Sequence, residues 1–319
     1  MQNLFSTLLR NYLNEIDGAK AVSICDRDGL IIASQDKEEF NNDPIIGVVS
    51  AVLDSYIDRI KQEFGDKTET NFMNITSTGN KKFVYCSMGP NSILTTVANL
   101  DTSDIALRIY SEHVASKVEL LIAGNENVSL KIPEIIRTLS NTKGGTLPTG
   151  EFSTKLILVG DFQVGKTSLI KRFVKNEFQE SYISTIGVEI SKKVVDIGDK
   201  TSINYIIWDI GGQVKQMIPY RKRFYSGASA GFIVVDRSRP ENQKSIEKWY
   251  NEIKESVSNN IPIVIVGNKS DLSDVVVSEK AIKEIADKYG FHYILTSAKT
   301  GENVNDAFIY VAYKFLETI

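Results

Sequence analysis

The chain has 319 residues, of which 42% are hydrophobic and 24% are charged, and at roughly 100–200 residues per domain this length predicts two domains. Its formal net charge of −3 provides no strong positive field, so we expect no nucleic-acid partner. Cys25 and Cys86 lack disulfide or metal-ligand spacing, which favours a cytoplasmic protein. No apolar run predicts a membrane span, and no lipidation motif is present, so we expect no direct lipid anchor.

The first half alternates helical and strand-like segments. Two apolar runs flank Asp26-Arg27-Asp28-Gly29, whose Asp-Gly step suits a tight hairpin. Pro44 opens a helix to about Phe64, and its apolar arc is too wide for one buried face, so we expect that helix to be buried on two sides. The expected elements are helices at 4–16, 44–64 and 103–122, and strands at 21–25, 30–34, 70–76, 82–88 and 92–98.

This order of elements, with its Asp-x-Asp-Gly hairpin, resembles the roadblock/LC7 family over residues 1–123. A longin domain is the nearest alternative. The resemblance implies an α+β domain with an antiparallel sheet and helices. Members of this family dimerise through the second helix and a neighbouring strand, and they serve as platforms for small GTPases, so the resemblance also implies a homodimer.

A breaker-rich stretch separates the two halves. Gly144-Gly145, Pro148 and Gly150 lie among Ser, Thr and Asn, a composition typical of a connector. Within it, residues 132–139 have the spacing of a short amphipathic helix. We therefore expect domains at 1–123 and 153–319, joined by a linker at 124–152.

The second half begins with a phosphate-binding motif. The segment Gly160-Asp161-Phe162-Gln163-Val164-Gly165-Lys166-Thr167 follows a short apolar strand and precedes a helical pattern, which is the setting that a P-loop requires. In such a loop backbone N–H groups face phosphate oxygens, Lys166 neutralises the β- and γ-phosphates, and Thr167 offers its hydroxyl to Mg²⁺.

Two later segments extend this pattern. Asp209 ends an apolar strand, where it can hold magnesium through water, and the N–H of Gly212 can meet a γ-phosphate. Asn268-Lys269-Ser270-Asp271 follows a buried-looking strand, and the Asp271 carboxylate can accept hydrogen bonds from two guanine donors that adenine lacks. The N–H of Ala298, in Thr296-Ser297-Ala298-Lys299, can donate to guanine O6. The base is therefore expected to be guanine.

These motifs, in this order, resemble the Ras-like small GTPases over residues 153–319. Residues 180–188 are similar to the first switch of Rab proteins, and residues 208–213 are more similar to the Arf second switch. The fold implied is an α/β P-loop GTPase domain with a mostly parallel sheet and helices on both faces. The resemblance also implies that Phe178 packs against the base, Thr185 completes the magnesium shell, Gln213 orients the attacking water, and Lys269 and Lys299 buttress the base pocket.

The candidate site therefore has three sets of residues. The catalytic set is Gln213, Lys166 and Thr185, and the metal set is Thr167, Thr185 and, through water, Asp209. The nucleotide-binding set is Gly160, Asp161, Phe162, Gln163, Val164, Gly165, Lys166, Thr167, Ser168, Phe178, Thr185, Gly212, Asn268, Lys269, Asp271, Ser297, Ala298 and Lys299.

The P-loop departs from the small-GTPase pattern at Phe162-Gln163, where Rab and Ras proteins mostly carry small residues. One interpretation places the phenyl ring beside the γ-phosphate, where it would crowd Gln213 and the path of an arginine finger. The other turns the ring outward as packing. Val214 also stands where Rab proteins commonly have Glu, so the second switch departs from the Rab pattern directly after Gln213.

The leading hypothesis is a molecular switch that binds GTP with Mg²⁺, hydrolyses it slowly to GDP, and carries its own dimerising roadblock platform. Hydrolysis would proceed by in-line attack of water, with charge absorbed by Lys166, Mg²⁺ and P-loop N–H groups. The alternative is a scaffold with bound nucleotide and little or no turnover. Thr185 and Gln213 favour turnover, whereas Phe162 favours the scaffold. Effectors and regulators are not identified by the sequence.

Overall fold

The structure is a computed structural model that describes residues 1–26, 29–37, 73–88, 92–140, 148–179, 185, 187–198, 201–211, 223–257 and 260–319. The chain divides into two compact units, Met1–Gly144 and Gly145–Ile319. No helix among the described residues is long and apolar enough to cross a bilayer.

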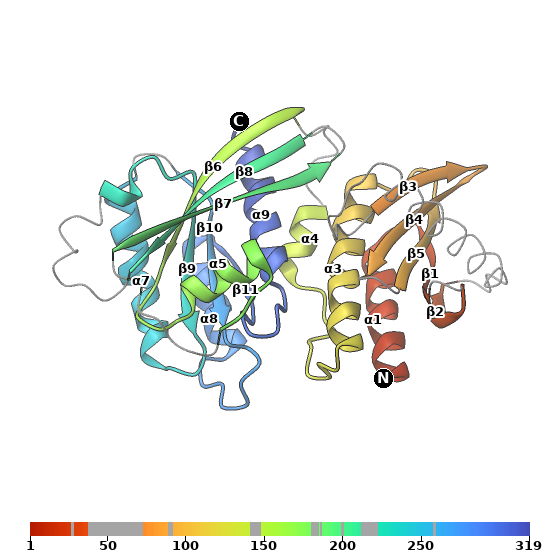
Figure 1. The fold of residues 1–319 in the computed structure, drawn as a ribbon, viewed down its shortest axis with the longest axis horizontal. Coiled ribbons are helices and arrows are strands. Elements are labelled where there is room, and N and C mark those ends of the chain that lie inside the picture. The colour runs from red at the N-terminus through yellow and green to blue at the C-terminus, as the bar shows by residue number, and fades with distance from the viewer. Residues whose placement is uncertain are drawn as a thin grey trace. The chain divides into compact units, whose positions relative to one another are not determined.

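The first unit has an antiparallel sheet in the strand order β2-β1-β5-β4-β3 (Figure 1). Helices α1 and α3 contact each other and also contact strands of this sheet. Its elements are α1 (Gln2–Glu15), β1 (Ala19–Asp26), β2 (Ile31–Asp36), β3 (Met73–Thr78), β4 (Lys81–Met88), β5 (Ser92–Asn99), α3 (Asp104–Ile122) and α4 (Glu134–Ser140).

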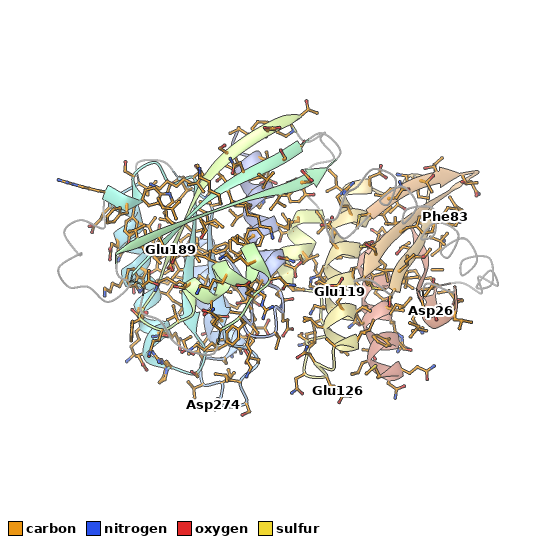
Figure 2. All side chains as sticks on the ribbon, in the orientation of Figure 1. Asp26, Phe83, Glu119, Glu126, Glu189 and Asp274 are labelled. Atoms are coloured by element: carbon orange, nitrogen blue, oxygen red, sulfur yellow. The ribbon has the colours of Figure 1, made fainter. Side chains whose placement is uncertain are left out.

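The core of the first unit lies between these helices and the sheet. In α1 the residues at helical spacing, among them Leu8, Leu9 and Leu13, are buried. Ser103 caps α3 by accepting a hydrogen bond from the N–H of Ala106 at 3.3 Å. Phe83, which Figure 2 places on β4, packs beside buried sheet residues. The helix expected at 44–64 lies outside the described residues.

The stretch expected as a linker at 124–152 contains ordered elements at both ends. Helix α4 packs on α3 because Ile135, Ile136 and Leu139 form a buried apolar stripe. Arg137 of α4 also forms a two-pronged ion pair with Glu15, with N–O distances of 2.5 and 2.6 Å. Strand β6 starts at Gly150, near the end of this stretch. Helix α4 agrees with the short helix expected at 132–139.

The second unit is a six-stranded sheet in the order β11-β10-β9-β6-β8-β7, parallel except for the antiparallel pair β7–β8. Figure 1 shows helices around this sheet. Its elements are β6 (Gly150–Val159), α5 (Lys166–Lys175), β7 (Val188–Gly198), β8 (Thr201–Ile210), β9 (Ala230–Asp236), α7 (Glu241–Lys254), β10 (Ile263–Asn268), α8 (Glu279–Tyr289), β11 (His292–Leu295) and α9 (Val304–Leu316).

Helices cover both faces of this sheet, as the sequence predicted. On one face, residues such as Ile157 and Ile233 share a buried cluster with Trp249 of α7 and Ile282 of α8. On the other face, Phe173 of α5 stacks on Phe308 of α9 with ring centroids 3.7 Å apart. Because both faces are buried, the strands are nearly continuous apolar runs, and all seven residues of β9 are buried.

Three buried polar residues of the second unit lie where parallel strands end. Strands β8, β9 and β10 carry Asp209, Asp236 and Asn268 at or next to their carboxyl ends, and all three side chains are buried. The carboxyl ends of parallel strands meet at one edge of a sheet, and this edge is where ligands bind in open α/β folds. The fold thus identifies this edge as the place to look for a site.

Candidate functional site

The loop between β6 and α5 depends on two glycines. Gly160 has φ 146°, and a Cβ there would lie 2.3 Å from the backbone oxygen of Val234. Gly165, at the N-cap of α5, has φ 97°, and a Cβ there would lie 2.3 Å from Nδ2 of Asn268. Only glycine fits these positions, so the loop lies directly against two neighbouring strands and presents the start of α5 to the pocket.

Lys166 is the first residue of α5, and its ammonium bends back over the loop. Nζ donates hydrogen bonds to the carbonyl oxygens of Gly160 and Asp161, both at 2.8 Å. The side chain is only 7% exposed, yet it lines the pocket described below. A positive charge is thus fixed inside the loop.

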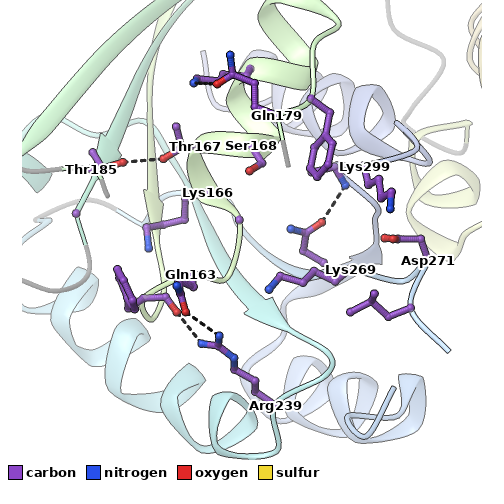
Figure 3. A pocket seen from close by; sticks show the side chains of 18 of the residues that line it. Gln163, Lys166, Thr167, Ser168, Gln179, Thr185, Arg239, Lys269, Asp271 and Lys299 are labelled. Carbon is purple, nitrogen blue, oxygen red and sulfur yellow. Dashed lines mark hydrogen bonds between the residues drawn. The ribbon is translucent and has the colours of Figure 1, made fainter. Parts of the chain in front are cut away.

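Three oxygen-bearing side chains meet beside this lysine. The hydroxyls of Thr167 and Thr185 are 2.8 Å apart, a contact marked in Figure 3. The Thr167 hydroxyl also donates to Oδ2 of Asp209, and Thr185 Oγ1 lies 3.3 Å from the same oxygen. Residues 167, 185 and 209 come from a helix start, a loop and a strand end, as the sequence predicted for a shared set.

The Asp209 carboxyl group is incompletely satisfied by the protein. Its Oδ1 atom is buried and has no hydrogen-bond partner among the described residues. Burial raises the pKa of Asp209, although hydrogen bonds from Thr167 and Thr185 and the charge of Lys166 act to lower it. A cation bound here would supply the missing partner. Hydroxyl and carboxylate oxygens are ligands that suit a hard cation such as Mg²⁺.

Among the described residues, no group of three or more His, Cys, Asp or Glu side chains is placed so that it could hold a metal ion.

Gly211, directly after β8, helps to keep Thr185 in place. Its N–H donates to Gly187 O at 3.0 Å, and a Cβ there would lie 2.6 Å from Thr185 O. The absence of a side chain at Gly211 therefore lets Thr185 approach the end of β8.

Asn268 joins the P-loop to the segment that follows β11. Its Nδ2 donates to Val164 O at 2.9 Å, and its Oδ1 accepts from Thr296 Oγ1 at 3.2 Å. Oδ1 also accepts from the N–H of Ala298 at 3.1 Å. The sequence predicted that this N–H would donate to guanine O6, and in the structure it is engaged by Asn268.

Asp271 lies where the base is expected. Oδ1 of this carboxylate accepts a hydrogen bond from Ser297 Oγ at 2.6 Å, and Ser297 Oγ in turn accepts from the N–H of Thr300 at 3.0 Å. Ser297 therefore orients the carboxylate and is fully buried behind it. The orientation prepares an acceptor for paired donors on a planar ligand.

Lys166, Thr167, Thr185, Asn268 and Asp271 line one pocket of about 490 Å³, shown in Figure 3, and Asp209 lies behind the two threonines. It is lined by most of the residues predicted to bind nucleotide: Phe162, Gln163, Gly165, Lys166, Thr167, Ser168, Phe178, Thr185, Asn268, Lys269, Asp271, Ala298 and Lys299. The other four described residues of that set do not line the pocket and are bonded to residues that do: Gly160, Asp161, Val164 and Ser297. Gly212 and Gln213 lie outside the described residues.

The second unit matches a known family along nearly its whole length. Residues 155–317 match the profile of the Ras family. Over 166 residues the chain is 39% identical to Ras-related protein RIC1 of Oryza sativa subsp. japonica and to GTP-binding protein YPTM2 of Zea mays. Each match covers 52% of this chain and 81% of the relative. The chain belongs to the Ras family. The matched residues all lie in the second unit.

Several lining residues of this Ras-family pocket were not predicted from the sequence. They are Lys171, Gln179, Glu189, Gly211, Arg239 and Leu272. Glu189, labelled on β7 in Figure 2, borders the pocket from the antiparallel edge of the sheet. Most of these residues have no motif to mark them. Arg239 lies three residues after the end of β9, at the same edge of the sheet as the motifs. This position in the sequence could have indicated that Arg239 lines the pocket.

The side chain of Asp161 points away from the pocket. Its carboxylate points toward α7, where Oδ2 accepts from Asn242 Nδ2 and Oδ1 accepts from Trp249 Nε1, both at 3.0 Å. The side chain thus fixes the loop to the helix behind it, and only its backbone is available to the Ras-family pocket.

Proposed function

We propose that the chain is a GTP-dependent molecular switch that binds GTP with Mg²⁺ and hydrolyses it slowly to GDP. GTPase activity follows from membership of the Ras family. The observation that carries the proposal is that one pocket is lined by Lys166, Thr167 and Thr185 and also by the oriented carboxylate of Asp271. Asp209 supports the lining from behind the two threonines.

In the proposed complex the phosphates lie over the P-loop. Backbone N–H groups of the loop and the ammonium of Lys166 stabilise the charge that spreads over the phosphate oxygens during in-line attack. Thr167, Thr185 and Asp209 would hold Mg²⁺, which when bound neutralises charge on the β- and γ-phosphates. Gln213, outside the described residues, remains the residue that we propose to orient the attacking water.

The base is proposed to be guanine, selected by Asp271. Its carboxylate accepts from both guanine donors, whereas adenine offers neither and would leave the carboxylate without ligand partners. Phe178, Lys269 and Lys299 line this end of the pocket and are proposed to flank the base.

For the first unit we propose a roadblock-type platform that forms a homodimer. The support is the described order of one helix, two strands, three more strands and a helix, arranged on an antiparallel sheet. The proposed dimer helix at 44–64 is outside the described residues, so the interface rests on its wide apolar arc in the sequence. Charged substitution at Val49 or Tyr56 should yield monomers that still bind GTP, and a wild-type monomer by sedimentation at tens of micromolar would contradict this proposal.

One observation favours the alternative of a nucleotide-bound scaffold with little turnover. Phe162 lines the pocket together with Lys166 and Thr185. A large apolar side chain in that place competes for space with an orienting glutamine or an arginine finger. In this alternative GTP binding is retained while hydrolysis is lost.

The deciding experiment identifies the nucleotide in the purified full-length protein and then measures single-turnover GTP hydrolysis with and without Mg²⁺. The switch predicts bound guanine nucleotide and a slow, magnesium-dependent conversion to GDP. The scaffold predicts bound GTP that persists. Equal affinity for ATP and GTP would contradict both.

A further inference from the structure

Gln163 and Lys269, on opposite sides of the pocket, have an unfavourable backbone conformation. Gln163 in the P-loop has φ 62°, and Lys269 after β10 has φ 65°. Neither is glycine, and such left-handed backbone costs roughly 1–2 kcal/mol per residue unless surrounding contacts fix it. Something in the pocket must therefore hold both residues.

Arg239, between β9 and α7, holds the phosphate side. Its guanidinium donates through Nη2 to Gln163 Oε1 at 2.9 Å and through Nη1 to Phe162 O at 3.1 Å, as Figure 3 shows. These are the two P-loop positions at which this chain departs from small residues. A planar guanidinium can reach both acceptors at once, which a lysine ammonium on a flexible stem does less well.

Asp236, at the end of β9, connects this arginine to the base side. Its Oδ2 lies 3.4 Å from Nε of Arg239 and accepts from Nζ of Lys269 at 2.6 Å. Its Oδ1 accepts from both the N–H and the hydroxyl of Ser238, at 2.9 and 2.7 Å. The carboxylate is fully buried, so its direction is fixed. Gln163 is bonded to Arg239, and Lys269 is bonded to Asp236.

We propose that Arg239 is a positioning residue that holds the P-loop in its nucleotide-binding conformation and, through Asp236, couples the phosphate side of the pocket to the base side. The inference rests on the proposed binding of guanine nucleotide in this pocket. Arg239 acts through Gln163 and the loop backbone, and its side chain remains 34% exposed at the pocket wall.

The test is the rate at which full-length protein, loaded with a fluorescent GDP analogue and Mg²⁺, releases that analogue into excess GDP. Arg239→Gln should release it about tenfold faster, equivalent to about 1.4 kcal/mol. Arg239→Lys should recover part of the loss, because it keeps the charge without the fork. Arg108→Gln is the matched control, since it makes the same change in α3 of the first unit, where Arg108 lies 3.9 Å from Glu112 and does not line the nucleotide pocket.

A second variant distinguishes positioning from general destabilisation. Glycine adopts φ 62° without strain and lacks the acceptor, so in a Gln163→Gly background the added Arg239→Gln change should accelerate release by less than about threefold. Phosphorus NMR of bound GDP should show shifted phosphate signals for Arg239→Gln and unchanged signals for Arg108→Gln. An equal effect of Arg239→Gln in both backgrounds would contradict positioning through Gln163.

The outcomes separate the two proposals. Wild-type protein that binds GDP, together with an Arg239→Gln variant that releases it at the wild-type rate, overturns this inference and leaves the proposed function intact. Wild-type protein that binds no guanine nucleotide overturns the proposed function. If Arg239→Gln does not fold, Arg239→Lys carries the test, because it keeps the charge and loses the fork. Faster release than in the wild type then supports the inference, and release at the wild-type rate overturns it.

Discussion

Among the described residues, each unit buries one lysine, and the two lysines make the same kind of contact. Lys117, in α3 of the first unit, is 1% exposed, and its ammonium donates to the carbonyl oxygens of Ser129 and Lys131. Lys166 donates to two carbonyl oxygens of the P-loop. Lys117 therefore anchors the chain that follows α3, whereas Lys166 also borders a pocket. Burial and hydrogen bonding alone do not distinguish a structural cation from a functional one.

The same contrast holds for buried uncharged groups. In the first unit the Tyr12 hydroxyl bonds to Thr96 Oγ1 and Ser111 Oγ, both at 2.8 Å, in the core between helices and sheet. Burial raises the pKa of Tyr12 to about 12. In the second unit the buried amide of Asn268 stands at the end of β10, and its hydrogen bonds reach the P-loop and the N–H of Ala298 beside the pocket. The position of a polar group relative to strand ends is thus more informative about function than its burial.

The largest expected effect belongs to the base end of the pocket. Asp271→Asn replaces a double acceptor by an amide, so affinity for GTP should fall about 10⁴-fold and preference should move to xanthine nucleotides. Equilibrium binding of GTP and XTP measures this change. Retained GTP preference in the variant would show that another group reads the base.

Lys166→Met should weaken GTP binding by about 10²–10³-fold, because it removes the fixed positive charge from the P-loop. The variant should still fold, since methionine retains most of the apolar stem of the lysine side chain. Calorimetric titration with GTP, combined with circular dichroism, separates the two effects. If binding is unchanged, the comparison between the two lysines fails.

Lys117→Met is the matched variant in the first unit. It leaves the carbonyl oxygens of Ser129 and Lys131 without this donor, so the free energy of unfolding should fall by about 1–3 kcal/mol. Nucleotide binding should remain at the wild-type level. Urea denaturation followed by circular dichroism gives the first quantity, and a GTP titration gives the second.

The smallest expected effect is a pH dependence at Asp236. Burial acts to raise its pKa, but hydrogen bonds from Lys269 and Ser238 outweigh this, and the net pKa is lowered from the ordinary 3.8. The carboxylate therefore contributes stability that is fully present above that value and is lost as the pH falls through the lowered pKa. Unfolding free energies below about pH 5 should show this loss in the wild type and not in Asp236→Asn. Asp104→Asn, at an exposed ion pair with Lys82, should leave the loss unchanged.

Local patterns in the sequence were sufficient for the Ras-family assignment, which is confirmed, and for the convergence of Thr167, Thr185 and Asp209. The order of strand, loop and helix places Thr167 at the start of α5, and the end of an apolar strand places Asp209 at the same edge of the sheet. The roles of Arg239 and Asp236 were not foreseen, because their contacts join residues more than seventy positions apart or cross between strands. Likewise, the hydrogen bond from the N–H of Ala298 to Asn268 joins two motifs thirty positions apart, which a sequence does not show. The donation of this N–H to guanine stays a prediction.

The hydrogen bond between Trp249 and Asp161 makes the P-loop optically accessible. The chain has two tryptophans, Trp208 and Trp249, and both lie in the second unit. Trp249 contacts the loop at 3.0 Å, and Trp208 precedes Asp209, with the Lys155 ammonium 3.8 Å above its ring. Tryptophan emission therefore arises only from the GTPase unit. Its change on unfolding should report on that unit without any label, and a change on adding nucleotide would test whether the P-loop responds to the ligand, while the first unit contributes only tyrosine signal.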